Sequence, residues 1–191
     1  MIQLRTFQPE DAEKIISWVD SPLVFYQWCA GFLGTYPITA ENLRQYYEKE
    51  GTDTDYHVLT AFHEQVIFAH LTMRFLKEEP GTARIGFLIL DTNLRGQGYG
   101  KKLMQEILKL AFSYDHIKQV TLGVFENNPR AKACYTACGF QEEKEKEPKT
   151  YPCMGEDWPF YDMKLSRTDW EKGVFLKKQI ESKGKQGLLL T

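Results

Sequence analysis

The sequence lacks most of the features that mark metal-bound, secreted or membrane proteins. Its four cysteines, at positions 29, 134, 138 and 153, form no CxxC pair and no cysteine and histidine cluster of zinc-binding spacing. No apolar stretch approaches the length of a membrane span, and the first residues contain neither a basic, apolar leader nor a small-residue cleavage site. We therefore expect a cytoplasmic protein with free thiols, no structural metal and no membrane partner.

An excess of charge of either sign is also missing. The 24 lysines and arginines nearly balance the 26 aspartates and glutamates, which leaves a formal net charge of -2. Such a balance creates no long-range field that would attract nucleic acid, so a nucleic-acid-binding protein is not expected. A chain of 191 residues is long enough to bury one core and is predicted to form one domain.

The alternation of apolar and polar residues predicts a mixed α/β (α+β) fold. Seven strands and four helices are expected in the order βααβββαβαββ, and the sheet is expected to be mostly antiparallel. The strands are predicted at 2–7, 55–62, 65–76, 82–90, 118–125, 140–147 and 158–166, and the helices at 9–20, 39–50, 98–113 and 129–138. Residues 1–166 then form the domain, and residues 167–191 a C-terminal extension whose polar, Gly-rich end is expected to fray.

The string LRGQGYGKKL follows a predicted strand and opens a predicted helix. Unpaired N–H groups and the positive end of the helix dipole meet at such a turn, so the turn is predicted to bind an anion. Two familiar nucleotide loops do not fit. Gly96, Gly98 and Gly100 have the wrong spacing for GxGxxG, and Arg95 stands where a Walker loop has its first glycine.

The string resembles instead the pyrophosphate loop of the GNAT superfamily of N-acetyltransferases, whose pattern Arg95, Gly98 and Gly100 match. A second string, ENNPRAKACYTACGF, resembles the other signature of this family, with Asn128 and Tyr135 at the usual intervals. The separation of the two motifs and the predicted order of elements over about residues 2–165 also resemble the family.

This resemblance implies an acetyl-CoA-dependent transferase that moves the acetyl group to a primary amine, with acetyl-CoA and the amine as partners. The amine would attack the thioester directly in a ternary complex, without an acetyl-enzyme. A non-catalytic acyl-CoA-binding or regulatory module on the same fold is the alternative. The acceptor is not identified, and a homodimer stays open.

The resemblance also assigns roles to individual residues. Tyr135 would be the general acid that protonates the departing thiolate, since a phenol suits that task. The cofactor would be bound by Ile89 and Leu90 along the pantetheine arm, by the pyrophosphate loop, and by Asn128. The loop residues are Arg95, Gly96, Gln97, Gly98, Tyr99 and Gly100.

Each assignment has a structural alternative. Residues 83–90 also fit an ordinary central strand, Tyr135 a packing residue and Asn128 a helix N-cap. The thiols of Cys134 and Cys138, one helical turn apart, are expected in the core.

The general base and the acceptor site are less well defined. Glu126, Asp91, His57 and His70 are candidates for the base, although each fits a surface or packing role, and a water relay is a further route. The aromatic stretch from Phe25 to Tyr36, which includes Trp28, either plugs the end of the sheet or, as the resemblance implies, covers the acceptor.

Overall fold

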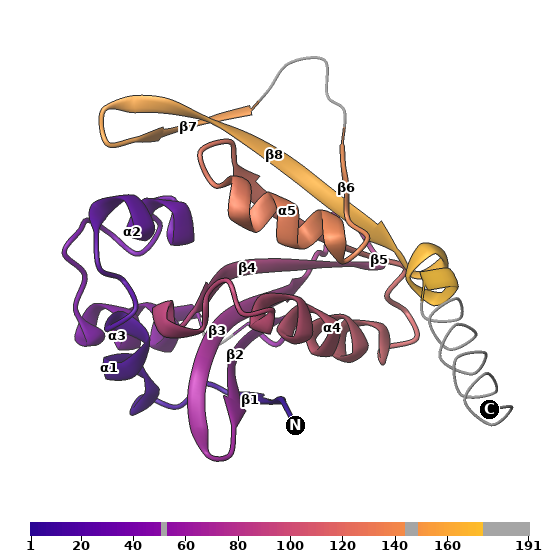
Figure 1. Ribbon diagram of the computed structural model, residues 1–191, viewed down its shortest axis with the longest axis horizontal. Coiled ribbons are helices and arrows are strands. Elements are labelled where there is room, and N and C mark those ends of the chain that lie inside the picture. Colours follow the sequence, from indigo (N-terminus) through magenta and orange to yellow (C-terminus); the bar gives the residue numbers. More distant parts are fainter. Residues whose placement is uncertain (51–52, 144–148, 174–191) are drawn as a thin grey trace, which may run out of the picture.

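The computed structural model describes residues 1–50, 53–143 and 149–173 and confirms the predicted α/β class (Figure 1). One eight-stranded sheet has the order β1-β2-β3-β4-β5-β8-β6, with β7 paired to β8, and only the β4–β5 pair is parallel. The strands are β1 (Gln3–Thr6), β2 (Tyr56–His63), β3 (Val66–Phe75), β4 (Thr82–Leu90), β5 (Gln119–Phe125), β6 (Gln141–Glu142), β7 (Lys149–Cys153) and β8 (Glu156–Ser166). The helices are α1 (Asp11–Ile16), α2 (Pro22–Cys29), α3 (Ala40–Glu50), α4 (Tyr99–Phe112) and α5 (Pro129–Ala137), and a 3₁₀ turn η1 spans Thr92–Leu94.

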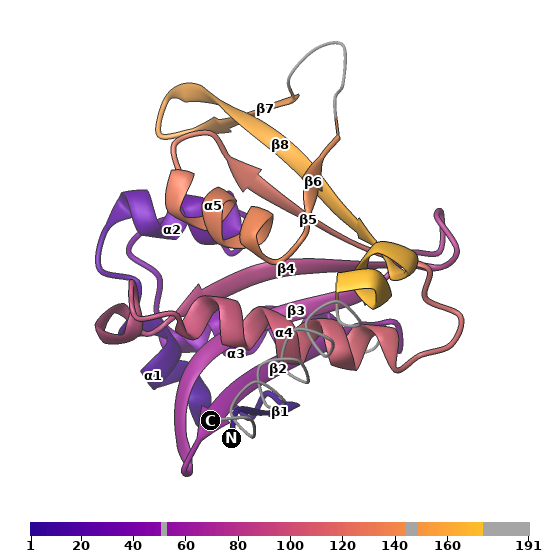
Figure 2. The same ribbon diagram turned by 45° about the vertical axis from the view of Figure 1, so that its right-hand side comes forward.

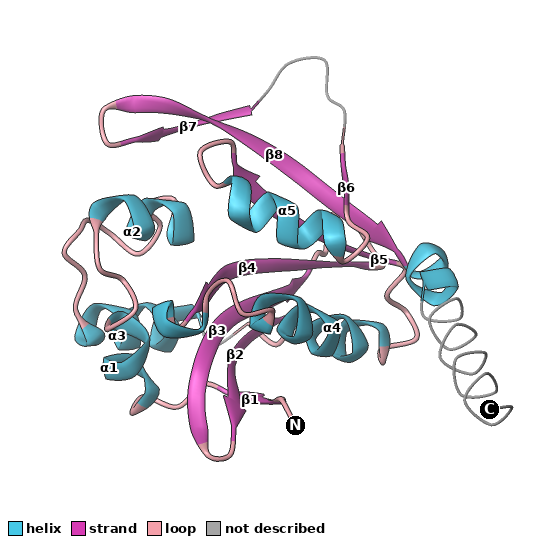
Figure 3. Ribbon diagram, in the orientation of Figure 1, coloured by secondary structure: helices cyan, strands magenta, loops and turns pink. Residues whose placement is uncertain are grey.

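Helices cover both faces of the sheet (Figure 3). The apolar stripe of α4 includes Leu103, Met104 and Ile107, which pack with inward-facing residues of β2 to β5 and β8. On the opposite face, α1 to α3 build a second core around buried Trp18 and Leu43. Among the residues that the structure describes, no helix is long and apolar enough to cross a membrane.

The structure corrects the predicted elements at both ends of the domain. Helix α2 lies in the aromatic stretch where no helix was predicted, and α1 ends at Ile16 rather than near Asp20. A local signal for α2 does exist, because Ser21 accepts a hydrogen bond from the Val24 N–H at 3.3 Å and Pro22 takes the first helical position. The aromatic and glycine content of the stretch concealed this start.

The second correction concerns the hairpin of β7 and β8. Strand β7 was not predicted. It contains Pro152, which lacks a backbone donor but is tolerated in an edge strand. Met154 and Gly155, with φ of +56° and +82°, form the two-residue turn that joins β7 to β8. The strand predicted at 140–147 is described only for Gln141–Glu142, and residues 144–148 lie outside the described part.

The sheet opens between its two parallel strands. The pairing of β4 with β5 runs from Thr82 opposite Gln119 to Ile85 opposite Leu122 and then stops. Figure 2 shows β5 and β8 diverging from β4, so that the sheet has one half built on β1 to β4 and another built on β5 to β8. The open end of this gap faces α2, the loop before α4 and α5.

The first part of the predicted C-terminal extension packs on the domain. Residues 167–173 are helical. The Arg167 guanidinium donates hydrogen bonds to the carbonyls of Phe112, Tyr114 and Ile117, at 2.8 to 2.9 Å. The Trp170 ring lies 4.9 Å from that of Phe112. The predicted frayed end lies outside the described residues.

Candidate active site

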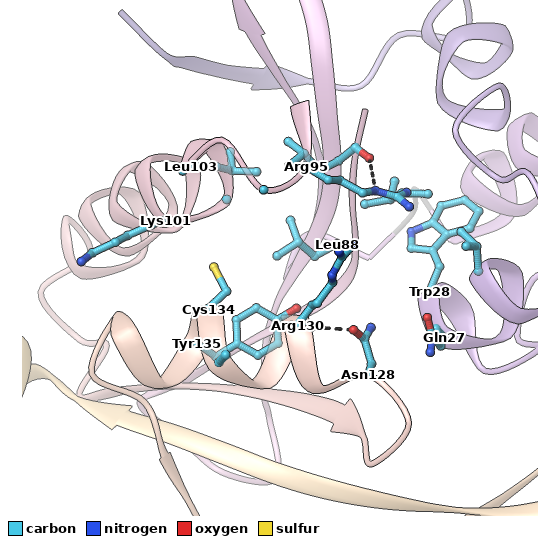
Figure 4. A pocket seen from close by; sticks show the side chains of 18 residues that line it. Gln27, Trp28, Leu88, Arg95, Lys101, Leu103, Asn128, Arg130, Cys134 and Tyr135 are labelled. Carbon is cyan, nitrogen blue, oxygen red and sulfur yellow. Dashed lines mark hydrogen bonds between the residues drawn. The ribbon is translucent and has the colours of Figure 1, made fainter. Parts of the chain in front are cut away.

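A cavity of about 600 Å³ lies at the open end of the gap between β4 and β5 (Figure 4). Its walls come from α2, the end of β4, the loop before α4, the first turns of α4, and α5. Eight of the residues predicted from the sequence line it, namely Ile89, Leu90, Arg95, Gly96, Gly98, Gly100, Asn128 and Tyr135. The fold therefore brings the two sequence motifs together around one space.

The loop before α4 has the geometry of an anion site. Gly96 and Gly98 have φ of +77° and +81°, a conformation that few residues other than glycine adopt. Among the described residues, no side chain caps the N-terminus of α4, and its first turn contains no acidic residue. A Cβ built on Gly98 would meet no atom within 4 Å, so the space beside this backbone is open. The free N–H groups and the helix dipole favour a phosphate there.

Within the part of the chain that the structure describes, three cationic side chains line the same cavity, and no carboxylate is among its lining residues. Arg95 is held against the protein, since its Nε donates to the Leu90 carbonyl at 3.2 Å and its Nη2 to that of Trp18 at 3.5 Å. Burial lowers the pKa of Arg95 from its usual value, although an arginine stays charged. Lys101 and Arg130 are exposed and project from α4 and α5. This charge distribution suits a ligand with several phosphates.

Tyr135 lies on α5, where the cavity borders the core. Its ring packs 6.2 Å from that of Phe140, and the residue also contacts the core under α4. Burial raises the pKa of the Tyr135 phenol well above its usual value, so the hydroxyl keeps its proton at neutral pH. Asn128 begins the same helix, and its Oδ1 accepts a hydrogen bond from the Ala131 N–H at 3.2 Å. Asn128 is thus an N-cap and a cavity residue at once.

Two predicted cofactor residues turn their side chains away from this space. The Gln97 amide donates to the Asn93 carbonyl at 2.6 Å, and the Tyr99 ring packs 5.9 Å from that of Phe68. Neither side chain lines the cavity. The side chains of Gln97 and Tyr99 therefore do not contribute to the cavity, although both residues lie in the predicted motif.

The expectation that Cys134 is a core residue is wrong. Cys134 is partly exposed and lines the cavity, whereas partly buried Cys138 packs against the core. A hydrogen bond with Cys138 lowers the pKa of Cys134 to about 7, and the nearby Lys101 charge adds to this effect. The helical pattern indicated that the two thiols share a face but could not show which part of that face is covered.

The four candidate bases have partners that do not line the cavity. Glu126 is exposed and accepts a hydrogen bond from the Tyr161 hydroxyl at 2.5 Å, and Asp91 accepts one from the Asn93 N–H at 3.0 Å. His57 packs 5.0 Å from the Phe75 ring.

His70 is fully buried, with its Nε2 2.7 Å from the Tyr47 hydroxyl, and burial lowers its pKa to about 3. None of the four candidates lines the described cavity.

The aromatic stretch divides between core and surface. Phe25 and Trp28 are buried, whereas the Phe32 side chain is 58% exposed. Trp28 lines the cavity together with Gln27, a residue that the sequence did not single out. Arg130 and Lys101 were also missed, although each stands within one of the two recognised motifs.

Comparisons with known proteins agree with this geometry. The model of the acetyltransferase (GNAT) family matches residues 21–140, more than half of the chain. Among solved structures, the spermidine N-acetyltransferase of Vibrio cholerae in complex with CoA and spermine has a TM-score of 0.75 and 18% identity, covering 88% of this chain and 97% of that one. The aminoglycoside acetyltransferase AAC(6')-Ib in complex with coenzyme A has a TM-score of 0.69 and 18% identity, covering 90% and 98%. This chain therefore belongs to the acetyltransferase (GNAT) family, whose co-substrate is acetyl-CoA.

Proposed function

We propose that this protein is an N-acetyltransferase that transfers the acetyl group of acetyl-CoA to a primary amine by direct attack in a ternary complex. The observation that carries the proposal is the cavity, in which the uncapped start of α4, three cationic side chains and the Tyr135 hydroxyl meet at the gap between β4 and β5. Family membership supplies the class of reaction, and the cavity supplies a site of matching size and charge.

Different residues of the cavity would bind different parts of acetyl-CoA. The N–H groups from Gly96 to Gly100 would hold the pyrophosphate, because the Arg95 N–H already donates to the Thr92 carbonyl at 3.3 Å. The exposed cations Lys101 and Arg130 would pair with the charge of the pyrophosphate. The main chain of Ile89 and Leu90, beyond the point where β4 leaves β5, would bind the pantetheine arm as an added strand does. Backbone N–H groups of β4 would also polarise the thioester carbonyl.

The chemical step requires one proton to leave the amine and one to reach the sulfur. Attack of the amine on the thioester forms the amide bond and breaks the C–S bond, which leaves a thiolate. The Tyr135 hydroxyl is protonated at neutral pH and makes no side-chain hydrogen bond within the described part of the chain. We assign to it the proton that the thiolate takes up as the C–S bond breaks. Because no carboxylate or histidine of residues 1–50, 53–143 or 149–173 lines the cavity, we assign the amine's proton to water.

The alternative is a non-catalytic acyl-CoA-binding module with the same fold. Tyr135 distinguishes the two, because a module that only binds acyl-CoA has no use for a proton donor at the sulfur. The test is release of free CoA thiol from acetyl-CoA in the presence of polyamines, aminoglycosides, amino acids and peptide N-termini. Polyamines are included because one structurally similar protein is a spermidine N-acetyltransferase in complex with spermine. Aminoglycosides are included because another is an aminoglycoside acetyltransferase.

Amine-dependent release supports the enzyme. Binding of acetyl-CoA without release for any acceptor supports the module. A chain that fails to bind acetyl-CoA at all would contradict both readings.

A further inference from the structure

Helix α2 connects the two halves of the sheet at the end where β4 and β5 do not pair with each other. Beyond Ile85 and Leu122, β4 and β5 no longer pair. Two residues of α2 span this gap, with Tyr26 packed 6.4 Å from the Trp158 ring of β8 and Trp28 packed 6.3 Å from the Phe87 ring of β4.

The contact with β4 is made at an irregular point of the strand. The register between β3 and β4 shifts next to Thr72, and Phe87 has a φ of +45°. A residue other than glycine in this conformation is strained and persists only where its surroundings hold it. The indole N–H of Trp28 donates to the Phe87 carbonyl at 2.7 Å, and Trp28 is only 7% exposed. The hydrogen bond thus fixes the irregular part of β4 from the side of α2.

The contact with the other half comes from the preceding residue. The Gln27 amide donates to the backbone carbonyl of Asn127 at 2.9 Å and to its Oδ1 at 3.2 Å. Asn127 lies in the loop between β5 and α5, immediately before the cavity residue Asn128. Gln27 and Trp28 also line the cavity themselves, as Figure 4 shows on the side opposite α4.

We infer that α2 is a brace that sets the width of the gap, and that Gln27 and Trp28 are positioning residues for acyl transfer. This inference rests on the proposed function. Each residue hydrogen-bonds to backbone next to a cavity residue, Trp28 to Phe87 beside Leu88 and Gln27 to Asn127 beside Asn128. The thioester and the amine would meet between these two walls. Neither bonds to the glycine loop, where the nucleotide part would be held. Loosening the brace should therefore disturb the alignment of the reacting groups, to which rates are sensitive, more than the affinity for acetyl-CoA.

Trp28→Phe and Gln27→Met each remove a donor. Methionine is close in size to glutamine, whereas phenylalanine keeps an aromatic ring at position 28 but is smaller than tryptophan. We expect each to lower kcat about three- to tenfold, the effect that one hydrogen bond supports, with the KM for acetyl-CoA within about twofold of wild type. The matched control is Leu23→Ala on the same helix, because Leu23 is 46% exposed and does not line the cavity. Its kcat should equal that of wild type.

The double variant tests whether both residues act on the same gap. Once one hydrogen bond is lost, the other no longer fixes the width of the gap. The kcat of the double variant Gln27→Met with Trp28→Phe should therefore fall by less than the product of the two single reductions in kcat. Hydrogen exchange gives a readout independent of activity. The amides of Phe87 to Leu90 should exchange faster in Trp28→Phe, whereas those of Ala83 to Ile85, where β4 is still paired, should keep their protection.

Three outcomes would overturn the inference. One is an unchanged kcat in both single variants. A second is a parallel rise of both KM values with a lower melting temperature, which indicates loss of packing alone. The third is unchanged exchange at Phe87 to Leu90 in Trp28→Phe. If wild type releases no CoA with any amine, the proposed function fails, and the exchange data still decide whether α2 holds the gap.

Discussion

A negative charge introduced into the glycine loop provides a direct test of whether the phosphates bind there. Gly98 begins α4 with a φ of +81°, and the space beside its Cα is open. Asparagine and aspartate tolerate this conformation better than other non-glycine residues and are nearly equal in size. The pair Gly98→Asn and Gly98→Asp therefore differs by one negative charge at the predicted anion site, and both variants should remain folded.

The expected magnitude follows from Coulomb's law. Two like charges about 4 Å apart near a protein surface repel by about 4 kcal/mol, which corresponds to a factor of about 10³ in affinity. Gly98→Asp should thus bind acetyl-CoA about a thousand times more weakly than Gly98→Asn, and added salt should narrow the difference because it screens exposed charge.

Titration calorimetry with acetyl-CoA measures the two affinities, and thermal melts confirm that both variants are folded. Equal dissociation constants for Gly98→Asn and Gly98→Asp would refute the reasoning, because a phosphate bound at this turn has to respond to a carboxylate. A large loss in both variants with no difference between them would show that the space matters and the charge does not.

Three further predictions concern other parts of the molecule. Tyr135→Phe should lower kcat by about 10²- to 10⁴-fold while calorimetry shows unchanged acetyl-CoA affinity, and an unchanged kcat under rate-limiting chemistry would make Tyr135 a packing residue. Alkylation of Cys134 by iodoacetamide, followed by mass spectrometry, should rise with pH around a midpoint of about 7, because the thiolate is the reactive form. Bound acetyl-CoA should slow it, and equal rates with and without acetyl-CoA would place the ligand elsewhere. Asp11→Asn should lose about 2 kcal/mol at pH 7 in urea melts, because the Asp11 carboxylate accepts two hydrogen bonds from Arg5 at 2.7 Å. These contacts lower the pKa of Asp11. The extra stability of wild type over Asp11→Asn should therefore be complete above the ordinary carboxyl pKa and vanish as the pH falls through the lowered value. A stability difference that persists in acid would contradict this origin.

Features that depend on neighbouring residues were predictable from the sequence alone. The helices at 39–50, 98–113 and 129–138 and six of the strands were predicted to within one or two residues, because apolar period, caps and glycine stops act over a few positions. The glycine loop at the start of α4 belongs to the same class, since positive φ and free N–H groups are local properties. Helix α2 was missed although its Ser21 and Pro22 start is local, because apolar residues on every side hid its period.

Features that depend on distant segments were decided by the tertiary structure. The cavity itself is one example. Helices α2 and α5 meet the end of β4 there because β4 and β5 stop pairing after Ile85 and Leu122. The packing of α5 leaves the part of its surface with Cys134 uncovered, so Cys134 lies in the cavity rather than in the core. The hydrogen bond from Trp28 to Phe87 joins residues far apart in the chain, and no spacing in the sequence predicts it. A one-dimensional pattern records which residues lie near one another along a helix or strand, whereas the width and lining of a gap depend on how those elements pack.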